Sequence, residues 1–305
     1  MKLDVIKLGD ETLASTRIRM KVIRALKDRY DIRVMSSTDP IEIEALVVFV
    51  QKTATRRVFD KLVKAKNNGV SIVYDVDDEF HVWKDMPLQK NMVQDIADVI
   101  TVDTDYRRNY VRGFTNKPIF VMPPVINYID EPVTKNHVGP VKNVVTFGNN
   151  KSVESAMKYT TFFKSKDFCQ IASAPIISGH RFIPWRLSTF IDNIIKFDVC
   201  FLSQFMDAGA RKSVNRLLVP LSVGVPVIAC NLPSYRKELE VLGLQYLVYE
   251  NGSDIPRIMD ALEDPIERQR IADIAQDAVW KKYNSGVVSD VLQKAITKSR
   301  EVQSS

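Results

Sequence analysis

The sequence predicts an α/β protein built around parallel β-sheets. Short apolar runs that suit buried strands alternate with longer amphipathic segments that suit helices along most of the chain. The alternation stops at Pro123-Pro124, gives way to an irregular stretch up to about Asn143, and then begins again. A chain of 305 residues suits two domains of about 150 residues each, or one large domain. We expect a first domain over 1–140, a second over 141–285 and a C-terminal helix over 286–305.

The first half carries the signals of several strands and of two helices. Ser15 or Thr16 is a candidate N-cap for a helix that runs to about Lys27. A second helix over 55–66 is expected to end at Asn67-Asn68-Gly69, because glycine readily takes the left-handed conformation of a helix stop. The expected strands lie near residues 2–8, 32–35, 45–50, 70–74, 99–102 and 119–122.

The second half repeats this order. Its most specific segment is an amphipathic helix that begins near Lys212 and is ended by Gly224 and Pro226. The last part of the chain, from about Pro265, is predicted to be largely helical. The expected strands lie near residues 144–147, 168–172, 199–202, 226–229 and 246–248.

The start of the helix near Lys212 has the features of a phosphate site. Lys212 and Ser213 stand at its N-terminus, where free backbone N–H groups, a hydroxyl and cations favour an anion. The alternative is an ordinary β-α-β unit whose helix cap is basic.

The composition is that of an ordinary globular protein, with 45% hydrophobic and 26% charged residues. The chain has no long apolar run of the kind that spans a membrane, and its start lacks the apolar core of a signal peptide. The three cysteines, at 169, 200 and 230, have no metal-binding spacing. We expect buried free thiols, no metal site and a cytoplasmic location.

The net charge is +6, and basic residues crowd one early segment. They are either the solvated face of a helix or an attraction for a polyanion, which could be a nucleotide, a nucleic acid or an anionic membrane. The basic residues are Arg17, Arg19, Lys21, Arg24, Lys27, Arg29 and Arg33.

Two motifs together resemble those of GT-B glycosyltransferases, close to family 4. The first is Lys-x-x-Asn-Arg-Leu followed by Gly-Val-Pro-Val-Ile-Ala, over Lys212–Ala229. The second is Ser-x-Arg-x-Arg, over Ser15–Arg19, directly after the first strand. The resemblance implies an α/β GT-B fold, with two Rossmann-like domains facing across a cleft that holds the nucleotide. It also implies a C-terminal helix that crosses back to the first domain.

The resemblance also implies a set of donor-binding residues. Lys212 and its neighbours would neutralise the diphosphate, and Arg17 or Lys151 could reach a phosphate. The chain departs from the family where two glutamates are expected, because Arg211 and Val219 occupy their positions. Asn215 or Glu238 could replace one of them. The full set of donor candidates is Arg17, Lys151, Lys212, Ser213, Asn215, Arg216 and Glu238.

A run of acids, Asp75-Val-Asp77-Asp78-Glu79, follows a predicted strand. One carboxylate could orient the acceptor hydroxyl or act as a general base. The acids could instead cap the next helix and pair with arginines, or bind Mg²⁺ as in GT-A enzymes. The candidate catalytic residues are Asp77, Asp78 and His81, and no metal or separate cofactor is expected.

The predicted activity is transfer of a sugar from a nucleotide-sugar, UDP-linked by default, to an acceptor hydroxyl, with retention of anomeric configuration implied by the family. One acceptor class is a cell-surface glycan or a lipid-linked precursor, with the early basic segment touching anionic lipid. A second is a hydroxymethylated base in duplex DNA, as for some phage enzymes of this architecture, which requires base flipping. A third interpretation is a non-catalytic nucleotide-binding α/β protein, since the glutamate pair is missing.

Overall fold

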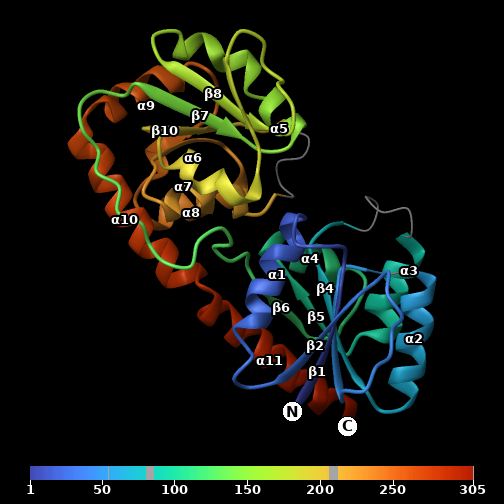
Figure 1. Cartoon of the computed structure of the whole chain (residues 1–305). Helices are drawn as coiled ribbons and strands as arrows, with labels where there is room; N and C mark the ends of the chain where they lie inside the picture. Colours follow the sequence, from blue (N-terminus) through green and yellow to red (C-terminus); the bar gives the residue numbers. More distant parts are fainter. Residues whose placement is uncertain (54, 80–85, 206–211, 305) are drawn as a thin grey trace. The chain divides into compact units, whose positions relative to one another are not determined.

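The computed structural model forms two compact units (Figure 1). Unit 1 contains Met1–Asn127 and Tyr283–Ser305, and unit 2 contains Tyr128–Lys282. The corresponding boundaries predicted from the sequence lie after residues 140 and 285. No helix within the described parts of the chain is both long enough and apolar enough to cross a membrane. The structure describes residues 1–53, 55–79, 86–205 and 212–304.

Unit 1 is an open sheet of six parallel strands in the order β2-β1-β3-β4-β5-β6. Each strand predicted for this half is present to within two residues at either end. The strands are β1 (Lys2–Lys7), β2 (Asp31–Ser36), β3 (Val47–Gln51), β4 (Ser71–Val76), β5 (Val99–Val102) and β6 (Ile119–Val121). The helices are α1 (Ala14–Arg24), α2 (Arg56–Asn67), α3 (Met86–Asn91), a π-helical turn over Met92–Ile96, α4 (Asp105–Arg112) and α11 (Ser285–Ser304).

Helices cover both faces of this sheet, as Figure 1 shows. Successive side chains of a strand point to opposite faces, so a strand buried on both sides is apolar throughout. In β3, Val47 and Phe49 belong to the core that includes α1 and α11, whereas Val48 and Val50 belong to the core that includes α2. The C-terminal helix α11 is therefore part of unit 1, where Leu292 is fully buried.

Two local predictions in unit 1 are wrong in detail. The cap of α1 is Leu13, and no side chain accepts a hydrogen bond at this helix start. Thr16 lies inside the helix, and its hydroxyl donates to the Leu8 carbonyl oxygen at 2.5 Å. Strand β4 runs on to Val76, which places Asp75 inside the sheet rather than after it. By contrast, α2 begins after its cap Thr55, and Gly69 follows it with φ of +80°, as predicted.

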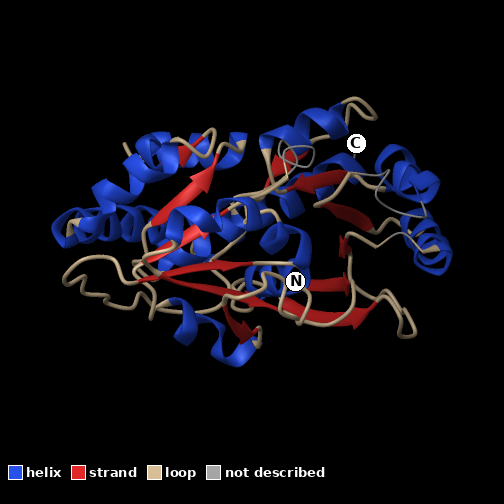
Figure 2. Cartoon of the chain, turned by 90° about the horizontal axis from the view of Figure 1, so that it is seen from above, coloured by secondary structure: helices blue, strands red, loops and turns tan. Residues whose placement is uncertain are grey.

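Unit 2 is a second open sheet of six parallel strands, in the order β12-β11-β10-β7-β8-β9. Figure 2 shows strands in red with helices in blue beside them. The strands are β7 (Asn143–Phe147), β8 (Asp167–Ala172), β9 (Arg181–Pro184), β10 (Val199–Leu202), β11 (Val227–Cys230) and β12 (Val248–Tyr249). The helices are α5 (Asn150–Glu154), α6 (Phe190–Ile194), α7 (Asn215–Ser222), α8 (Pro233–Val241), α9 (Asp254–Glu263) and α10 (Pro265–Tyr283), with 3-10 turns over Met157–Phe163, Leu187–Thr189 and Gln245–Leu247.

The helix predicted near Lys212 is α7, and it begins at Asn215. Its cap is Val214, and no side chain accepts a hydrogen bond there, so Ser213 is not a cap. The helix ends as predicted, because Gly224 adopts φ of +70° and the Val225 N–H turns back to the Pro220 carbonyl oxygen at 2.9 Å.

A buried ion pair ties α1 to the middle of the sheet in unit 1. Arg19 Nε lies 2.9 Å from Asp75 Oδ2, and the two side chains are 3% and 0% exposed. Asp75 Oδ1 also accepts from the Thr101 hydroxyl at 2.7 Å, and Arg19 Nη1 donates to the Met122 carbonyl oxygen at 2.9 Å. The pair is therefore hydrogen-bonded to its surroundings as well as to itself, which offsets the cost of removing both charges from water.

We predict that Asp75→Ala lowers the free energy of unfolding by about 3–5 kcal/mol, because it leaves the Arg19 charge buried without its carboxylate. The control is Glu11→Ala, which removes an exposed ion pair with Arg24 and is expected to cost less than about 1 kcal/mol. Urea denaturation of both variants measures the difference. Equal costs would show that the buried pair is not what stabilises this unit.

Candidate functional site

The candidate site residues gather near the carboxyl ends of the strands, where ligands bind in open α/β sheets. The favoured position is the point at which successive strands add to opposite sides of a first strand. In unit 2 that point lies between β7 and β10. Arg17, Asp77 and Asp78 lie in unit 1, whereas Lys151, Lys212, Ser213, Asn215, Arg216 and Glu238 lie in unit 2. His81 lies outside the described residues.

The loop between β7 and α5 forms one wall of the site in unit 2. Gly148 has φ of +142°, a conformation that residues with a Cβ rarely adopt. A Cβ at this position would lie 3.0 Å from Ser152 Cβ and 3.2 Å from Arg216 Nε. Asn149 then caps α5 by accepting from the Ser152 N–H at 2.9 Å. The missing side chain at Gly148 lets the Arg216 guanidinium approach the loop.

Arg216, in the first turn of α7, connects the ends of β7 and β10. Its Nη1 donates to the Ser203 carbonyl oxygen, just beyond β10, at 2.6 Å. Its Nη2 donates to the Thr146 hydroxyl of β7 at 3.4 Å. The guanidinium carbon lies 5.4 Å from the centre of the Phe147 ring, a cation–π distance. One cation therefore braces the two strands between which the sheet order reverses.

Polar atoms at the start of α7 have no partners within the described chain. Asn215 Oδ1 and Arg216 Nε are buried and make no hydrogen bond there. Buried polar atoms are usually satisfied, so these two atoms in successive residues leave hydrogen-bonding capacity for a ligand, an ion or water. Lys212 is exposed and Ser213 is partly buried just before this turn. The first turn of a helix also presents backbone N–H groups that favour an anion.

The two other donor candidates of unit 2 differ in their surroundings. Lys151 is exposed in the first turn of α5, directly after the Gly148 loop. Glu238 is 5% exposed on α8, and its Oε2 accepts from Lys282 Nζ at 2.7 Å. Glu238 is thus held against the end of α10.

In unit 1, Lys52 holds two of the acids that follow β4. Its Nζ lies 2.9 Å from Asp77 Oδ1 and 2.5 Å from Asp78 Oδ2. Lys52 has φ of +55°, a left-handed conformation that costs a residue other than glycine roughly 1–2 kcal/mol. Its N–H donates to the Asp75 carbonyl oxygen at 3.0 Å, which ties this turn to β4. The strained backbone places the ammonium between the two carboxylates.

Asp77 is an acid whose ionisation is altered at this edge. Burial raises the pKa of Asp77 to about 6, against the opposing charge of Lys52 and with the help of Asp75 and Asp78. The Asp77 carbonyl oxygen accepts from Arg107 Nη2 at 2.9 Å, which fixes the backbone beside it. A carboxyl group that titrates near neutral pH is well suited to accept a proton from a hydroxyl.

The remaining predicted groups of unit 1 are engaged by the chain itself. Glu79 Oε1 accepts from the Tyr106 hydroxyl at 3.0 Å. Arg17 is 6% exposed, and its Nη1 donates to the Glu11 carbonyl oxygen at 2.9 Å, so it braces the loop after β1. Within the described ranges, no group of three or more histidine, cysteine, aspartate or glutamate side chains is placed to hold a metal ion.

Sequence reasoning missed two residues of these edges. Lys52 is an ordinary lysine in the sequence, and only its left-handed backbone and its position opposite Asp77 single it out. Ser203 contributes a backbone carbonyl, which any residue type could supply. The one usable signal is position, because both residues lie within two positions of the end of a predicted strand.

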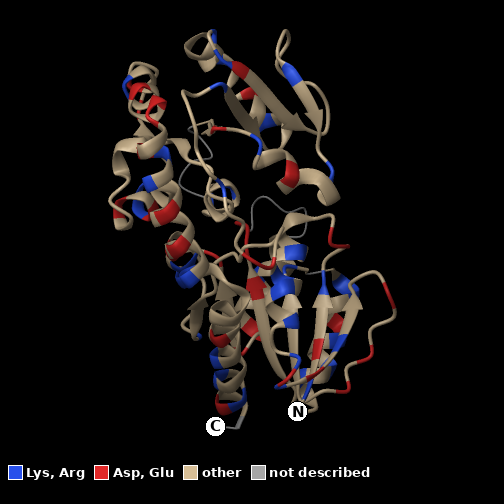
Figure 3. Ribbon diagram, turned by 60° about the vertical axis from the view of Figure 1, so that its left-hand side comes forward, with Lys and Arg blue, Asp and Glu red and all other residues tan. Residues whose placement is uncertain are grey.

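The basic residues of the early segment mostly bind groups of the chain itself, and Figure 3 shows acidic residues interspersed among the basic ones. Besides Arg19, Arg33 binds Asp4 at 2.9 Å and Glu44 at 2.7 Å, and Arg29 binds Asp290 at 2.7 Å. These arginines are therefore paired with acids of the chain itself.

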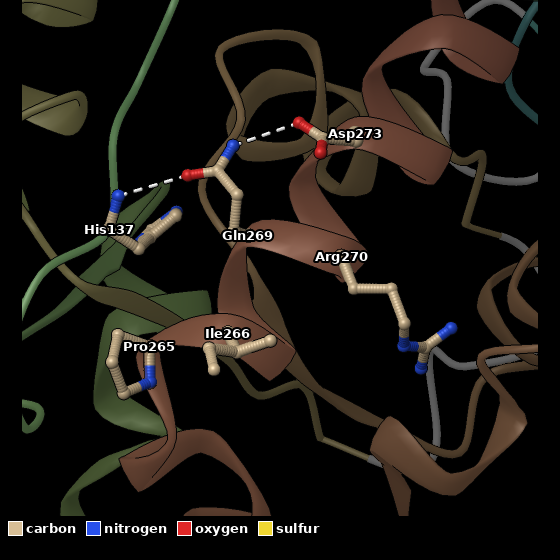
Figure 4. A pocket seen from close by; sticks show the side chains of 6 residues that line it. All are labelled: His137, Pro265, Ile266, Gln269, Arg270 and Asp273. Atoms are coloured by element: carbon tan, nitrogen blue, oxygen red, sulfur yellow. Dashed lines mark hydrogen bonds between the residues drawn. The ribbon is translucent and has the colours of Figure 1, made fainter.

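A hollow of about 490 Å³ on unit 2 is not part of the candidate site (Figure 4). It lies against the start of α10, where His137 N–H donates to Gln269 Oε1 at 3.0 Å and Gln269 Nε2 donates to Asp273 Oδ1 at 2.8 Å. His137 also contacts the Gly224 carbonyl oxygen at 2.9 Å, at the end of α7 where β11 is about to begin. The hollow therefore lies near the amino ends of the strands, opposite to the ligand-binding edge.

The fold is that of the GT-B glycosyltransferases. The structure resembles a mutant of T4 phage BGT in complex with UDP-glucose, with a TM-score of 0.63 and 10% identity over 97% of this chain and 99% of that one. It also resembles an α,α-trehalose 6-phosphate synthase from Burkholderia multivorans, with a TM-score of 0.55 and 12% identity over 97% and 77% of the two chains. A third likeness is to an O-GlcNAc transferase mutant from Thermobaculum terrenum, with a TM-score of 0.55 and 12% identity over 99% and 68%. No protein-family model matches the sequence, and no curated protein matches it.

We predict that the free energy of unfolding of the chain depends on pH through the titration of Asp77. Its pKa is about 6 in the folded chain and near the ordinary 3.8 when unfolded, so the folded state binds the proton more tightly. Lowering the pH from 7 to 5 should therefore stabilise the native chain by about 1 kcal/mol relative to Asp77→Asn. Urea denaturation of both proteins at the two pH values measures this difference.

The control for this measurement is Asp105→Asn, which changes an exposed acid of the same unit. A parallel pH dependence of wild type and Asp77→Asn would contradict a raised pKa at Asp77.

Proposed function

We propose that the chain is a glycosyltransferase that moves a sugar from a nucleotide-sugar, UDP-linked by default, to an acceptor hydroxyl. The observation that carries the proposal is the start of α7, where Arg216 braces β7 and β10 and buried polar atoms lack partners. The likeness to T4 phage BGT in complex with UDP-glucose supports the same class of donor. The proposal needs no metal and no cofactor besides the donor.

In this proposal the diphosphate of the donor binds between the Gly148 loop and the start of α7. Lys212 and Arg216 neutralise it, and backbone N–H groups of the first turn of α7 donate to its oxygens. Lys151 and Ser213 lie in the two segments that flank this position. Departure of the nucleoside diphosphate builds negative charge on the leaving oxygen, and fixed cations stabilise that charge most where water is excluded.

The acceptor side of the proposal lies in unit 1. Asp77 accepts the proton of the attacking hydroxyl, and its pKa is raised by burial against the opposing charge of Lys52. His81 stays a candidate for this side. Retention of anomeric configuration is part of the proposal on the strength of the family 4 motifs, and no protein nucleophile is assigned.

We predict that UDP-glucose raises the thermal midpoint of the chain, since a ligand at 100 times its Kd stabilises a protein by about 2.7 kcal/mol. Lys212→Ala should weaken binding at least tenfold, because a charge-assisted hydrogen bond contributes about 1.5–3 kcal/mol. Lys212 is exposed, so its removal should leave the fold intact. A thermal-shift titration against a panel of nucleotides and nucleotide-sugars measures both effects.

The matched control is Lys164→Ala, which removes another exposed cation of unit 2 away from the α7 start. If no nucleotide or nucleotide-sugar shifts the midpoint, the donor site does not exist as proposed. Binding that survives Lys212→Ala unchanged would place the donor elsewhere. Binding with no transfer to any acceptor and no donor hydrolysis would favour the non-catalytic nucleotide-binding protein.

Two acceptor classes remain in the proposal. The first is a cell-surface glycan or lipid-linked precursor, and the second is a hydroxymethylated base in duplex DNA. The likeness to a phage transferase favours the second, and the pairing of the early arginines within unit 1 removes the main argument for a membrane contact.

We predict transfer of labelled sugar from UDP-glucose to duplex DNA that contains hydroxymethylated bases, with none to the unmodified duplex of the same sequence. Binding to the duplex should fall steeply with salt, because phosphate contacts release counterions. Transfer only to a glycan or lipid-linked acceptor, together with sedimentation on anionic vesicles, would assign the first acceptor class instead.

A further inference from the structure

A segment of unit 2 without helix or strand, residues 133–141, depends on side chains of α9 and α10 for hydrogen bonds. Backbone N–H and C=O groups outside regular structure need partners from side chains or water. Before Val141, apolar contacts anchor the segment poorly, because His137 alone is buried among residues 131–140 and Val138 is 79% exposed. The hydrogen bonds join the Val133 carbonyl oxygen to Gln276 Nε2 at 2.9 Å, the His137 N–H to Gln269 Oε1 at 3.0 Å, the Gly139 carbonyl oxygen to Arg268 Nη2 at 2.6 Å, and the Val141 N–H to Glu263 Oε2 at 3.0 Å.

His137 holds the middle of this segment by both nitrogens of its ring. Nε2 lies 2.9 Å from the Gly224 carbonyl oxygen, which can only accept, so Nε2 carries the ring proton. Nδ1 then has a lone pair, and Arg268 Nε donates to it at 3.4 Å. The neutral ring therefore serves one acceptor in the turn that ends α7 and one donor on α10.

Arg268 presents a buried cation to this ring. It is 0% exposed, and its guanidinium also donates to the carbonyl oxygens of Leu262, Glu263 and Gly139 at 2.5, 3.0 and 2.6 Å. Leu262 and Glu263 end α9, where the carbonyl oxygens form the negative end of the helix dipole and stabilise a cation. His137 therefore has only to offer a neutral acceptor to Arg268.

A second proton on His137 would reverse this contact. It would occupy Nδ1, so the ring would lose its acceptor and would face the Arg268 guanidinium as a second cation. Burial lowers the pKa of His137 from the ordinary 6.5, and the charges of Lys135 and Arg268 lower it further, against the effects of the Gly224 hydrogen bond and of Asp198. The attached ring is therefore neutral at neutral pH.

The acids near the ring are already bound to other groups. Asp198, just before β10, accepts through Oδ2 from the N–H groups of Lys142 and Asn143 at 2.8 and 2.9 Å. Asp273 Oδ1 accepts from Gln269 Nε2 at 2.8 Å. The charged groups that face His137 are Lys135 of its own segment, Asp198, and Arg268, Arg270 and Asp273 of α10.

Solvent reaches His137 from the hollow of about 490 Å³ at the start of α10 (Figure 4). His137 lines this hollow together with Gln269, which accepts from the His137 N–H. A proton can therefore pass from water to the ring while the segment is still attached to α10.

We propose that His137 is a pH-sensitive switch, whose protonation detaches residues 133–141 from α10 and from the Gly224 turn while the sheet of unit 2 stays folded. The detached ring regains the ordinary proton affinity of imidazole, whereas the attached ring binds a proton weakly. Acid therefore favours the detached state, starting below about pH 6.5 and continuing down to the lower pKa of the attached ring. Neither a sugar donor nor an acceptor takes part, so the switch stands apart from the proposed transfer reaction.

The test is hydrogen–deuterium exchange of the purified full chain at pH 7.5 and 5.5, with each rate compared with the intrinsic rate of a free amide at that pH. Protection of the 133–141 amides should fall about tenfold, because pH 5.5 is about one unit below the pKa of a free imidazole. The amides of β7, β10 and β11 should keep their protection. Protonation of Asp77 cannot imitate this result, since Asp77 lies in unit 1 and its protonation stabilises the folded state.

His137→Gln and His180→Gln are matched variants. Glutamine keeps an Nε2 donor for the Gly224 carbonyl oxygen and does not titrate in this range, so in His137→Gln the tenfold pH dependence should disappear. His180 is partly buried in the same unit, against the Phe168 ring, so His180→Gln should retain that dependence. An NMR titration of the His137 ring in the wild-type chain needs no variant. The ring should stay neutral down to the pH at which the segment loses protection.

Equal protection of the 133–141 amides at the two pH values would overturn the proposal, as would an equal loss in His137→Gln. Loss of protection that extends to β7 and β10 would also overturn it, because the whole unit would then be unfolding in acid. A His137 ring that takes up its proton near pH 6.5 while the segment stays protected would show that the contact with Arg268 tolerates the charge, against the proposal.

Discussion

Parallel pairing of the strands brings the candidate ligand groups of each unit to one edge of its sheet. Each parallel strand needs a crossover, and the crossovers run in opposite directions on the two sides of the first strand. In unit 2 this opens a position between β7 and β10 that the Gly148 loop and the start of α7 surround. In unit 1 the equivalent position lies between β1 and β3, where Gln51 Oε1 accepts from the Leu8 N–H at 3.2 Å. The same topology therefore produces two polar edges, and the residue types decide what each edge can do.

The two edges differ in how far their charges are compensated. In unit 1, Asp75 is paired with Arg19, and Asp77 and Asp78 share Lys52. Such an edge can hold and release a proton near neutral pH, since burial raises the pKa of Asp77 in spite of the Lys52 cation beside it. A cation whose role is to bind an anionic ligand would not need a carboxylate of the chain beside it. The arrangement suits the acceptor side of a transfer reaction better than the donor side.

Sequence patterns identified the elements whose signals are local. Thr55 and Gly69 delimit α2 because capping and left-handed stops are properties of a few neighbouring residues. The start of α7 was placed too early, because Lys212 and Ser213 look like a helix start although the backbone there is not helical. The position of Asp75 inside β4 was missed for a related reason. An acid normally ends a buried strand, and only the distant Arg19 and Thr101 make it acceptable within the sheet.

The site residues were predictable to the extent that a short motif carries them. Arg216 lies in the motif over Lys212–Ala229, and the structure places it beside the Gly148 loop. The partner of Glu238 was not predictable, because Lys282 is 44 residues away in sequence and meets it only through the packing of α8 and α10. Lys52 escaped for the same reason, since its role depends on a backbone conformation and on the approach of β4.

Arg216 is the strongest single argument that unit 2 binds an anion. Its hydrogen bonds go to the Ser203 carbonyl oxygen and the Thr146 hydroxyl, and its ring contact is with Phe147, so all these partners are neutral. The buried arginine of unit 1, Arg19, has a carboxylate. A guanidinium held in place by neutral groups keeps its full charge, and partial burial of that charge is costly unless an anion joins it. A diphosphate between the Gly148 loop and α7 would supply that anion and would also reach the unsatisfied Nε of the same side chain. Arg216 therefore suits a role beyond stabilising the fold, because an uncharged side chain could donate the same kind of hydrogen bonds to these neutral acceptors.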